Sequence, residues 1–124
     1  MNLLLDTHIL LWWLTASARL SKDARRAMAD CDAAYVSAAT VWEIGIKRAL
    51  GKLEVPDNLG EALQDSSFLP LPVYIVHAIA AGKLPRHHDD PFDRMLVAQA
   101  SVESLTLLTA DARLKDYNVP VLLA

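Results

Sequence analysis

The sequence predicts an α/β fold: a parallel sheet of about five strands in the middle of a three-layer sandwich, with helices on both faces. Short apolar runs alternate with helical patterns along the 124 residues, which is typical of consecutive βαβ units. Prolines in two of the apolar runs indicate strands at the edges of the sheet. We expect residues 1–124 to form one domain, because this length leaves no room for two and 53% hydrophobic residues can bury a sizeable core.

The first half of the chain alternates between strand and helix patterns. The apolar run 2–5 predicts a buried first strand, and a helix is expected over 7–14. Ser21 can cap a second helix that runs to about residue 29. A short second strand is expected at 34–36. A long helix over 39–50 follows, and Gly51 ends it because glycine is common just after a helix.

The second half continues the same alternation. Either Asp57 or Asn58 can open a helix through residue 64. Asp90 and Pro91 mark the start of a strong helix to about residue 103, since proline is favoured at the first helical position. The other predicted elements are strands at 68–73, 105–108 and 119–123 and a helix from the third strand to residue 81.

The prolines determine the predicted strand order. Pro70 and Pro72 fall in the third strand and Pro120 falls in the fifth, so both strands belong at edges, where a missing N–H donor is tolerated. Right-handed crossovers then favour the order 3-2-1-4-5. This order reverses between strands one and four, which Asp6 and Asp111 follow. Both residues are therefore expected in the crevice that forms at such a switch point.

Composition excludes several classes of protein. The single cysteine, Cys31, rules out an internal disulfide, and it suits a reducing cytoplasm. The apolar start is not expected to be a signal peptide, because no basic residue precedes it and Asp6 and His8 interrupt it. No segment has the ~20 apolar residues that span a bilayer. We therefore expect a cytoplasmic protein without membrane association.

The net charge of −3 does not by itself indicate a nucleic-acid binder. If four carboxylates converge on a cation, however, the remaining residues carry a net charge of about +1. A bound divalent ion would then reverse the sign of the site.

Two of the candidate carboxylates follow the central strands. Asp6 interrupts an apolar run, and Asp111 follows the fourth strand. Each has an ordinary structural explanation, because aspartate is a leading helix-capping residue. Asp6 can cap the helix that starts at Thr7, and Asp111 can cap a short turn through Leu114.

The other two candidates lie on predicted helices. Glu43 shares a stripe with Ile46 and Leu50, and it can also pair with Lys47 one turn later. Asp93 is not needed as a cap, because Asp90 and Pro91 already explain the helix start. Its stripe neighbours are Leu96, Val97 and Ala100. A carboxylate on an apolar stripe is costly unless it is paired or binds a cation, although the helix dipole also favours a first-turn acid.

The predicted topology brings all four carboxylates toward one crevice. They would repel one another there, and a shared hard cation such as Mg²⁺ or Mn²⁺ would relieve the repulsion. His87 and His88 are a weaker candidate for a transition-metal site, and a solvated loop that can meet phosphates is the simpler interpretation. The tryptophans, which are expected in the core or at an interface rather than as base-stacking platforms, are Trp12, Trp13 and Trp42.

Four collinear segments resemble VapC-like PIN domains, the toxin ribonucleases of type II toxin–antitoxin modules. They are LLDTH at 4–8, VSAATVWEI at 36–44, DPFDRMLVAQA at 90–100 and LTAD at 108–111. Together they span nearly the whole chain, and the first combined with the last two is quite specific.

The resemblance implies a PIN-like fold whose acidic site for Mg²⁺ or Mn²⁺ consists of Asp6, Glu43, Asp93 and Asp111. It also implies an RNA substrate, a cognate antitoxin and a homodimer. The polar residues Thr7, Ser37 and Thr109 look like support for the acids, and Asp90 is an alternative ligand one turn before Asp93. The candidates for contacts to flanking phosphates, which can equally be surface or salt-bridge residues, are Lys47, Arg48, Arg86 and Arg94.

Three other functions compete with an RNA-cleaving enzyme. A non-catalytic nucleic-acid or protein binding module can share the fold, but such a module could lose its acids and this chain keeps four. A phosphoacceptor receiver domain has the order 2-1-3-4-5 and needs an acidic pair after strand one, where Asp6 stands alone. Cleavage of DNA rather than RNA is equally compatible with an acidic site.

Overall fold

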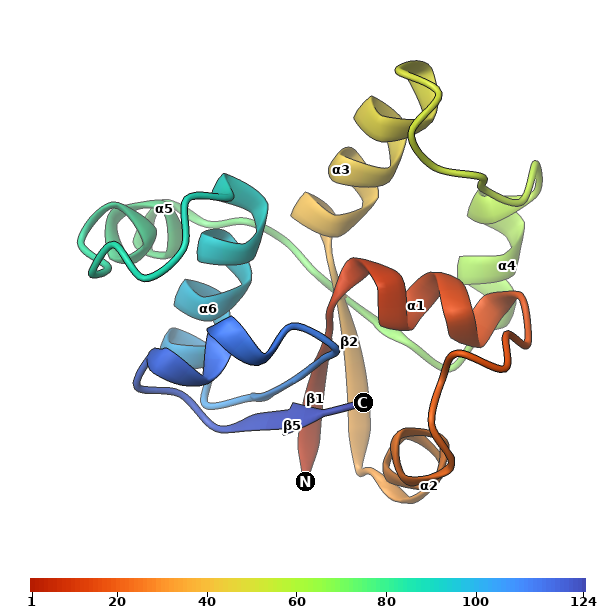
Figure 1. Ribbon diagram of the computed structural model, residues 1–124, viewed down its shortest axis with the longest axis horizontal. Coiled ribbons are helices and arrows are strands. Elements are labelled where there is room, and N and C mark those ends of the chain that lie inside the picture. Colours follow the sequence, from red (N-terminus) through yellow and green to blue (C-terminus); the bar gives the residue numbers. More distant parts are fainter.

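The computed structural model describes residues 1–124 and contains one five-stranded sheet in which all the paired strands are parallel (Figure 1). The order β3-β2-β1-β4-β5 confirms the predicted order. The strands are β1 (Asn2–Leu5), β2 (Ala33–Ser37), β3 (Leu69–Leu71), β4 (Thr106–Thr109) and β5 (Val121–Leu123). The helices are α1 (Thr7–Leu14), α2 (Lys22–Asp30), α3 (Ala38–Ala49), α4 (Leu59–Asp65), α5 (Ile75–Gly82), α6 (Pro91–Glu103) and the 3₁₀ helix η1 (Ala112–Asp116).

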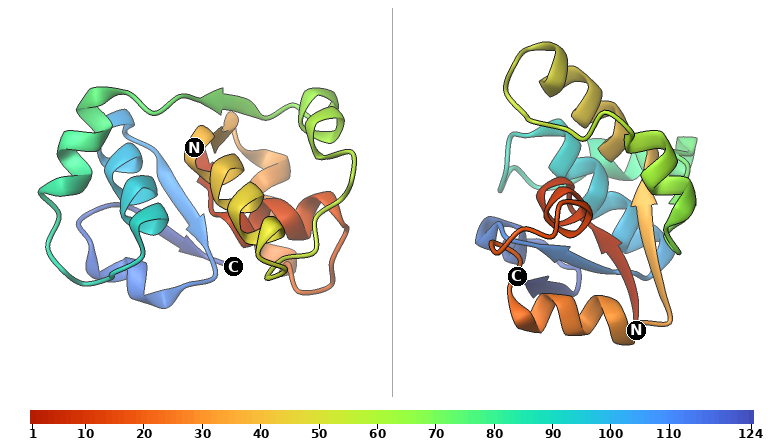
Figure 2. Two further views of the ribbon diagram at one scale, coloured as in Figure 1. Left: turned by 90° about the horizontal axis from the view of Figure 1, so that it is seen from above. Right: turned by 90° about the vertical axis from the view of Figure 1, so that its right-hand side faces the viewer.

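Helices cover both faces of the sheet, as predicted. Side chains of β1 alternate between two apolar cores, because successive residues of a strand point to opposite faces. Leu3 and Leu5 pack with α1 and α2 in one core, and Leu4 packs with α6 in the other. Figure 2 shows α5 and α6 on one side of the sheet and α1 and α4 on the other. The three layers follow directly from an apolar first strand that is buried on both faces.

The proline prediction is confirmed at both edges of the sheet. β3 contains Pro70 and lies at one edge, and Pro120 directly precedes β5 at the other. The expected strands 68–73 and 119–123 are both shortened to three residues. Pro72 and Pro120 lie just outside the observed strands, since neither residue has an N–H to extend the ladder.

Helix capping follows the sequence signals at most positions. The side chains of Asp6, Ser21 and Asp90 accept hydrogen bonds from the first turns of α1, α2 and α6. Gly51 has a φ of 69°, a left-handed conformation that suits glycine after α3. Asn58 occupies the position before α4 but makes no side-chain capping bond.

No helix is long and apolar enough to cross a membrane.

Candidate active site

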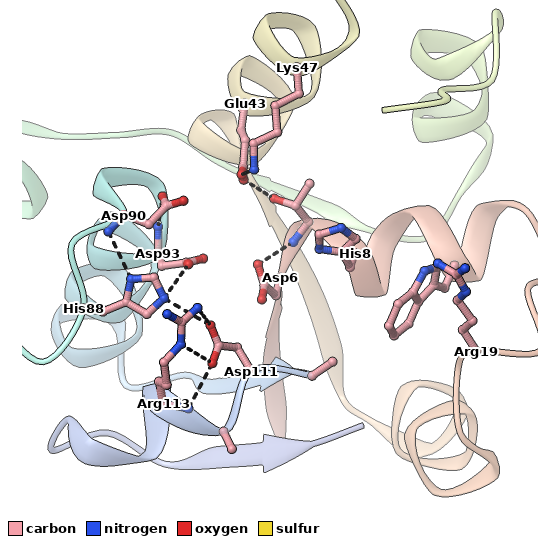
Figure 3. A pocket seen from close by; sticks show the side chains of 14 residues that line it. Asp6, His8, Arg19, Glu43, Lys47, His88, Asp90, Asp93, Asp111 and Arg113 are labelled. Atoms are coloured by element: carbon pink, nitrogen blue, oxygen red, sulfur yellow. Dashed lines mark hydrogen bonds and ion pairs between the residues drawn. The ribbon is translucent and has the colours of Figure 1, made fainter. Parts of the chain in front are cut away.

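A pocket of about 520 Å³ opens beside the carboxyl ends of β1 and β4, where the strand order reverses (Figure 3). Its lining includes Asp6, Glu43, Asp93 and Asp111, so the expected convergence of the four acids is confirmed. Asp90 is a fifth carboxylate in the lining. The same lining contains three permanently charged cations, Arg19, Lys47 and Arg113. The pocket is therefore acidic in balance.

Asp6 is buried at the end of β1 and held from two sides. Its carboxylate accepts a 2.7 Å hydrogen bond from the Thr7 amide, so the capping role that the sequence suggested is real. Its other oxygen accepts a 2.6 Å bond from the Thr109 hydroxyl at the end of β4. Burial raises the pKa of Asp6 above its usual value, although both hydrogen bonds lower it. One carboxylate thus ties together the two strands that frame the pocket.

Glu43 is buried on α3 and faces the pocket, as its position on the apolar side of the helix predicted. Its oxygens accept hydrogen bonds from the Thr7 hydroxyl and from Lys47 Nζ, the latter at 2.5 Å. The i,i+4 pair therefore forms without turning Glu43 away from the pocket. The expected stripe is wrong at its end, because Leu50 is exposed beyond the last turn packed on the sheet.

Asp93 is half-buried in the first turn of α6, on the same helix as the buried Leu96 and Val97. Burial raises the pKa of Asp93 to about 8, and the negative charges of the other acids in the pocket add to the effect. The side chain therefore takes up a proton near neutral pH when no cation is bound. This behaviour matches a carboxylate that is placed for a ligand rather than for helix stability.

Asp111 lies just after β4 and carries two roles as well. Its side chain caps η1 through the Arg113 amide, as the structural explanation predicted. The Arg113 guanidinium also donates to both of its oxygens, at 3.0 and 2.8 Å. These charge-assisted bonds hold the pKa of Asp111 well below its usual range.

Asp90 acts mainly as the cap of α6. Its side chain accepts hydrogen bonds from the amides of Phe92 and Asp93, at 2.8 and 3.2 Å. Asp90 also lines the pocket, but its Oδ1 atom is engaged by the helix. This arrangement favours Asp93 over Asp90 as the site carboxylate on α6.

The polar residues next to the acids differ in what they contact. Thr7 and Thr109 bond directly to Glu43 and Asp6, in agreement with a supporting role. Ser37 does not contact a carboxylate. Its hydroxyl is fully buried and accepts from the Ala39 amide, so it caps the helix that carries Glu43.

The sequence offered His88 only as a weaker metal-site candidate or as part of a solvated loop, and the structure places it in the pocket lining. It is 8% exposed rather than solvated, and its Nε2 lies 3.1 Å from Asp111 Oδ2 and 3.2 Å from Asp93 Oδ2. The adjacent His87 is exposed, so the expected solvated loop holds for one histidine and is wrong for the other. His88 lies in a loop and not on a helix face, so no periodic pattern in the sequence indicates that its side chain is buried.

The expected phosphate-binding cations fall into two groups. Lys47 lines the pocket, and Arg86 lines a smaller neighbouring pocket that it shares with Arg113. Arg48 instead pairs with Asp57 at an exposed position away from the pocket. The Arg94 guanidinium is also engaged elsewhere: it donates to carbonyl oxygens of the last turn of α5 and of the loop before α6.

Two further cations in the pocket, Arg19 and Arg113, had no distinguishing sequence signal. Arg19 lies in the turn between α1 and α2, close to Trp12 in the pocket lining. Trp13 packs against Phe68 beside a core, as expected. Trp42 is exposed and meets Phe92 edge to face, so it is not a core residue, and its place at an interface stays a prediction.

The side chains present fit a hard divalent cation. Carboxylate oxygens are the preferred ligands of Mg²⁺ and Mn²⁺. Atoms of His88, Asp93 and Asp111 that can act as ligands lie within 4.8 Å of one another, and Asp6 faces the same space in Figure 3. Converging carboxylates, one with a raised pKa, are the arrangement that a cation would stabilise. Such a cation beside a ring of basic side chains suits the binding and cleavage of a phosphate ester.

Comparisons with known proteins agree with this geometry. The PIN domain family model matches residues 3–120. Ribonuclease VapC22 of Mycobacterium tuberculosis is 29% identical over 126 residues, which cover 96% of this chain and 94% of that protein. The fold is also similar to chains in two DNA-bound crystal structures. One is VapBC2 from Rickettsia felis, with a TM-score of 0.74, 15% identity and coverage of 99% and 98% of the two chains. The other is VapBC from Salmonella typhimurium, with a TM-score of 0.72, 17% identity and coverage of 98% and 97%.

Replacing Asp93 with Asn is expected to stabilise the metal-free protein at neutral and alkaline pH. A carboxyl group whose pKa is raised on folding, here from 3.8 to about 8, does not oppose folding below the lower value. Between the two values, the destabilisation of the folded state by this group grows as the pH rises, and above the higher value it stays constant. We expect Asp93→Asn to gain about 1 to 3 kcal/mol at pH 8, less than the full shift implies because the side chain is partly solvated, and little at pH 4.

Urea unfolding in EDTA at several pH values measures this difference. Asp89→Asn removes the same charge from an exposed neighbouring position and should follow the wild type. If Asp93 instead stabilises the first turn of α6 through the helix dipole, its replacement by Asn should lower the stability of the protein. A less stable Asp93→Asn protein at pH 8 would therefore show that Asp93 is structural.

Proposed function

This chain belongs to the PIN-domain family, and we propose that it is a Mg²⁺- or Mn²⁺-dependent ribonuclease, the toxin of a type II toxin–antitoxin module. The observation that carries the proposal is the convergence of four carboxylates from separate elements in one pocket. The name of the Mycobacterium tuberculosis relative, a ribonuclease, supports RNA as the substrate. The VapBC assemblies among the structural neighbours support an antitoxin partner. We place its action in the cytoplasm, where RNA is available.

The proposed cation site consists of Asp6, Glu43, Asp93 and Asp111. A divalent cation held by these side chains would supply Lewis acidity toward the attacking water and the scissile phosphate. The protein contributes geometry. Asp6 and Glu43 are buried and fixed by threonine hydroxyls, so they need little rearrangement to bind.

The basic residues of the pocket are proposed to hold the RNA backbone. Arg19, Lys47 and Arg113 surround the acids, and phosphate contacts position a nucleic acid without reading its sequence. Lys47 and Arg113 now neutralise Glu43 and Asp111. A cation bound by these acids would take over the neutralisation, which leaves both basic side chains available for phosphates.

The first prediction from this proposal is that Asp6→Asn and Asp93→Asn each reduce RNA cleavage by at least about 100-fold while the fold is retained. Neutral amides are poorer ligands for a hard cation than carboxylates. Cleavage of a generic RNA with Mg²⁺ or Mn²⁺ is compared with cleavage in EDTA, and Asp89→Asn is the control with the same loss of charge on the surface.

Binding of the cation is checked separately through stability. Mn²⁺ at ~100 times its dissociation constant should stabilise the wild-type fold by about 2.7 kcal/mol, and Asp93→Asn should lose most of this gain. Full cleavage in EDTA would refute the metal mechanism. Binding of RNA without cleavage under any metal condition would favour the non-catalytic binding module.

The second prediction concerns toxicity. Expression of the wild-type chain alone should arrest growth, because an unrestrained ribonuclease damages essential RNA, and co-expression of the protein encoded beside it should relieve the arrest. The Asp93→Asn chain should be harmless at the same protein level, as measured by growth curves and immunoblots. Equal harmlessness of both chains would argue against the toxin assignment.

The third prediction concerns a homodimer through α5 and its surroundings. Large apolar side chains are exposed there, and contiguous apolar patches of this kind mark interfaces. The patch is formed by Trp42, Val73, Tyr74, Ile75, Val76 and Ile79. Ile75 is 80% exposed, so Ile75→Asp should disrupt a dimer without disturbing the core.

Sedimentation velocity distinguishes the two states. The wild type is expected to sediment as a dimer and Ile75→Asp as a monomer. Leu50→Asp, a substitution of similar exposure at the far end of α3, should leave the dimer unchanged. A monomeric wild type, or a dimer that tolerates Ile75→Asp, would show that this patch is not the dimer interface.

A further inference from the structure

We infer that His88 is a positioning residue for the proposed cation site: its Nε2–H donates to Asp111 and lies against Asp93, and the ring is not itself a ligand of the cation. This inference rests on the proposed function and goes beyond it, because it assigns a role to a side chain outside the four acids.

The position of His88 is what distinguishes it from a surface histidine. Its Nε2 is 3.1 Å from Asp111 Oδ2 and 3.2 Å from Asp93 Oδ2, so one ring atom contacts both carboxylates. Asp93 belongs to α6 and Asp111 follows β4, so His88 bridges two separate elements (Figure 3). The side chain is buried, with 5% of its surface exposed.

The other ring nitrogen determines which atom carries the proton. His88 Nδ1 accepts a 3.0 Å hydrogen bond from the Asp90 backbone amide, and an amide can only donate. Nδ1 must therefore be unprotonated, and the proton of the imidazole is on Nε2. A nitrogen that binds a metal must be free of its proton. In this orientation Nε2 is a donor to carboxylates and is blocked as a ligand.

The loop that carries His88 is held in place by Arg94. The Arg94 guanidinium donates to the carbonyl oxygens of Ala81, Leu84 and Pro85 at 3.0 to 3.1 Å. Arg94 and the Tyr117 hydroxyl also donate hydrogen bonds to the carbonyl oxygen of His88 itself, each at 3.5 Å. The role of Arg94 is thus to fix the backbone from which the imidazole projects. This anchor explains why His88 differs from the exposed His87.

Holding Asp93 and Asp111 together favours cation binding. Asp93 and Asp111 belong to separate elements, and the His88 ring between them fixes their relative position before a cation arrives. The His88 ring, hydrogen-bonded to Asp111 and 3.2 Å from Asp93, keeps an oxygen of each within reach of the same cation and leaves the second oxygen of Asp93 open. Residues that orient metal ligands in this way typically change metal affinity by 10- to 100-fold when they are replaced.

Isothermal titration of Mn²⁺ into the full chain tests the assignment. His88→Ala removes the donor and should weaken Mn²⁺ binding by about 10-fold or more. His88→Gln places an amide N–H₂ near the position of Nε2, and an amide nitrogen is a donor but not a ligand. It should therefore retain affinity within about threefold of the wild type. His87→Ala is the matched control at the exposed neighbour, and circular dichroism checks the fold of each variant.

Pulsed electron paramagnetic resonance of bound Mn²⁺ gives a readout that does not depend on activity or on folding of a variant. The wild type should lack the ¹⁴N coupling of a directly bound imidazole. A strong ¹⁴N coupling that disappears in His88→Ala would make His88 a ligand and overturn the inference. Unchanged affinity in His88→Ala, or equal losses in His88→Ala and His88→Gln, would also overturn it while leaving the ribonuclease proposal intact. A wild type that binds no Mn²⁺ would overturn both.

Discussion

The parallel pairing of β1 with β4 is the constraint on which the rest of the site depends. Leu5 lies opposite Leu108, and the pairing continues past the strand ends through a 2.9 Å bond from the Asp6 amide to the Leu108 carbonyl. The Thr109 hydroxyl then fixes the Asp6 carboxylate. A slip of one residue would exchange the faces of the β1 leucines and so mismatch the packing of both cores. The packing that stabilises the sheet therefore also sets the position of Asp6 relative to the residues that follow β4.

The electrostatic cost of this arrangement explains much of what surrounds the acids. Two unit charges about 5 Å apart at an effective dielectric of ~20 repel by roughly 3 kcal/mol. The fold reduces this repulsion in three ways: Lys47 neutralises Glu43, Arg113 neutralises Asp111, and Asp93 has a raised pKa and takes up a proton. Such local compensation is typical of a site in which function takes precedence over stability.

Most of the fold and the four acids could be predicted from the sequence because their signals are local. Pro70 and Pro120 identify the edge strands. Asp90 caps α6, so a capping role is not needed to explain Asp93. His88 could not be predicted, because its burial depends on Arg94 reaching back from α6 to the preceding loop. The same contact gives Arg94 a structural role, where the sequence left a phosphate contact and a surface or salt-bridge role equally open. Contacts between a helix and a loop leave no periodic pattern in the sequence.

The net charge of −3 was a poor guide to function for a related reason. A net charge describes the whole surface, whereas the behaviour of a crevice depends on which charges meet there. Here five carboxylates and three permanent cations share one pocket, and two of the cations are engaged by the acids. With a divalent cation bound by the acids, the formal local charge of −2 is cancelled even though no residue of the chain has changed. For a site of this kind, the order of the strands is therefore more informative than the composition, because topology decides which carboxylates a cation can reach together.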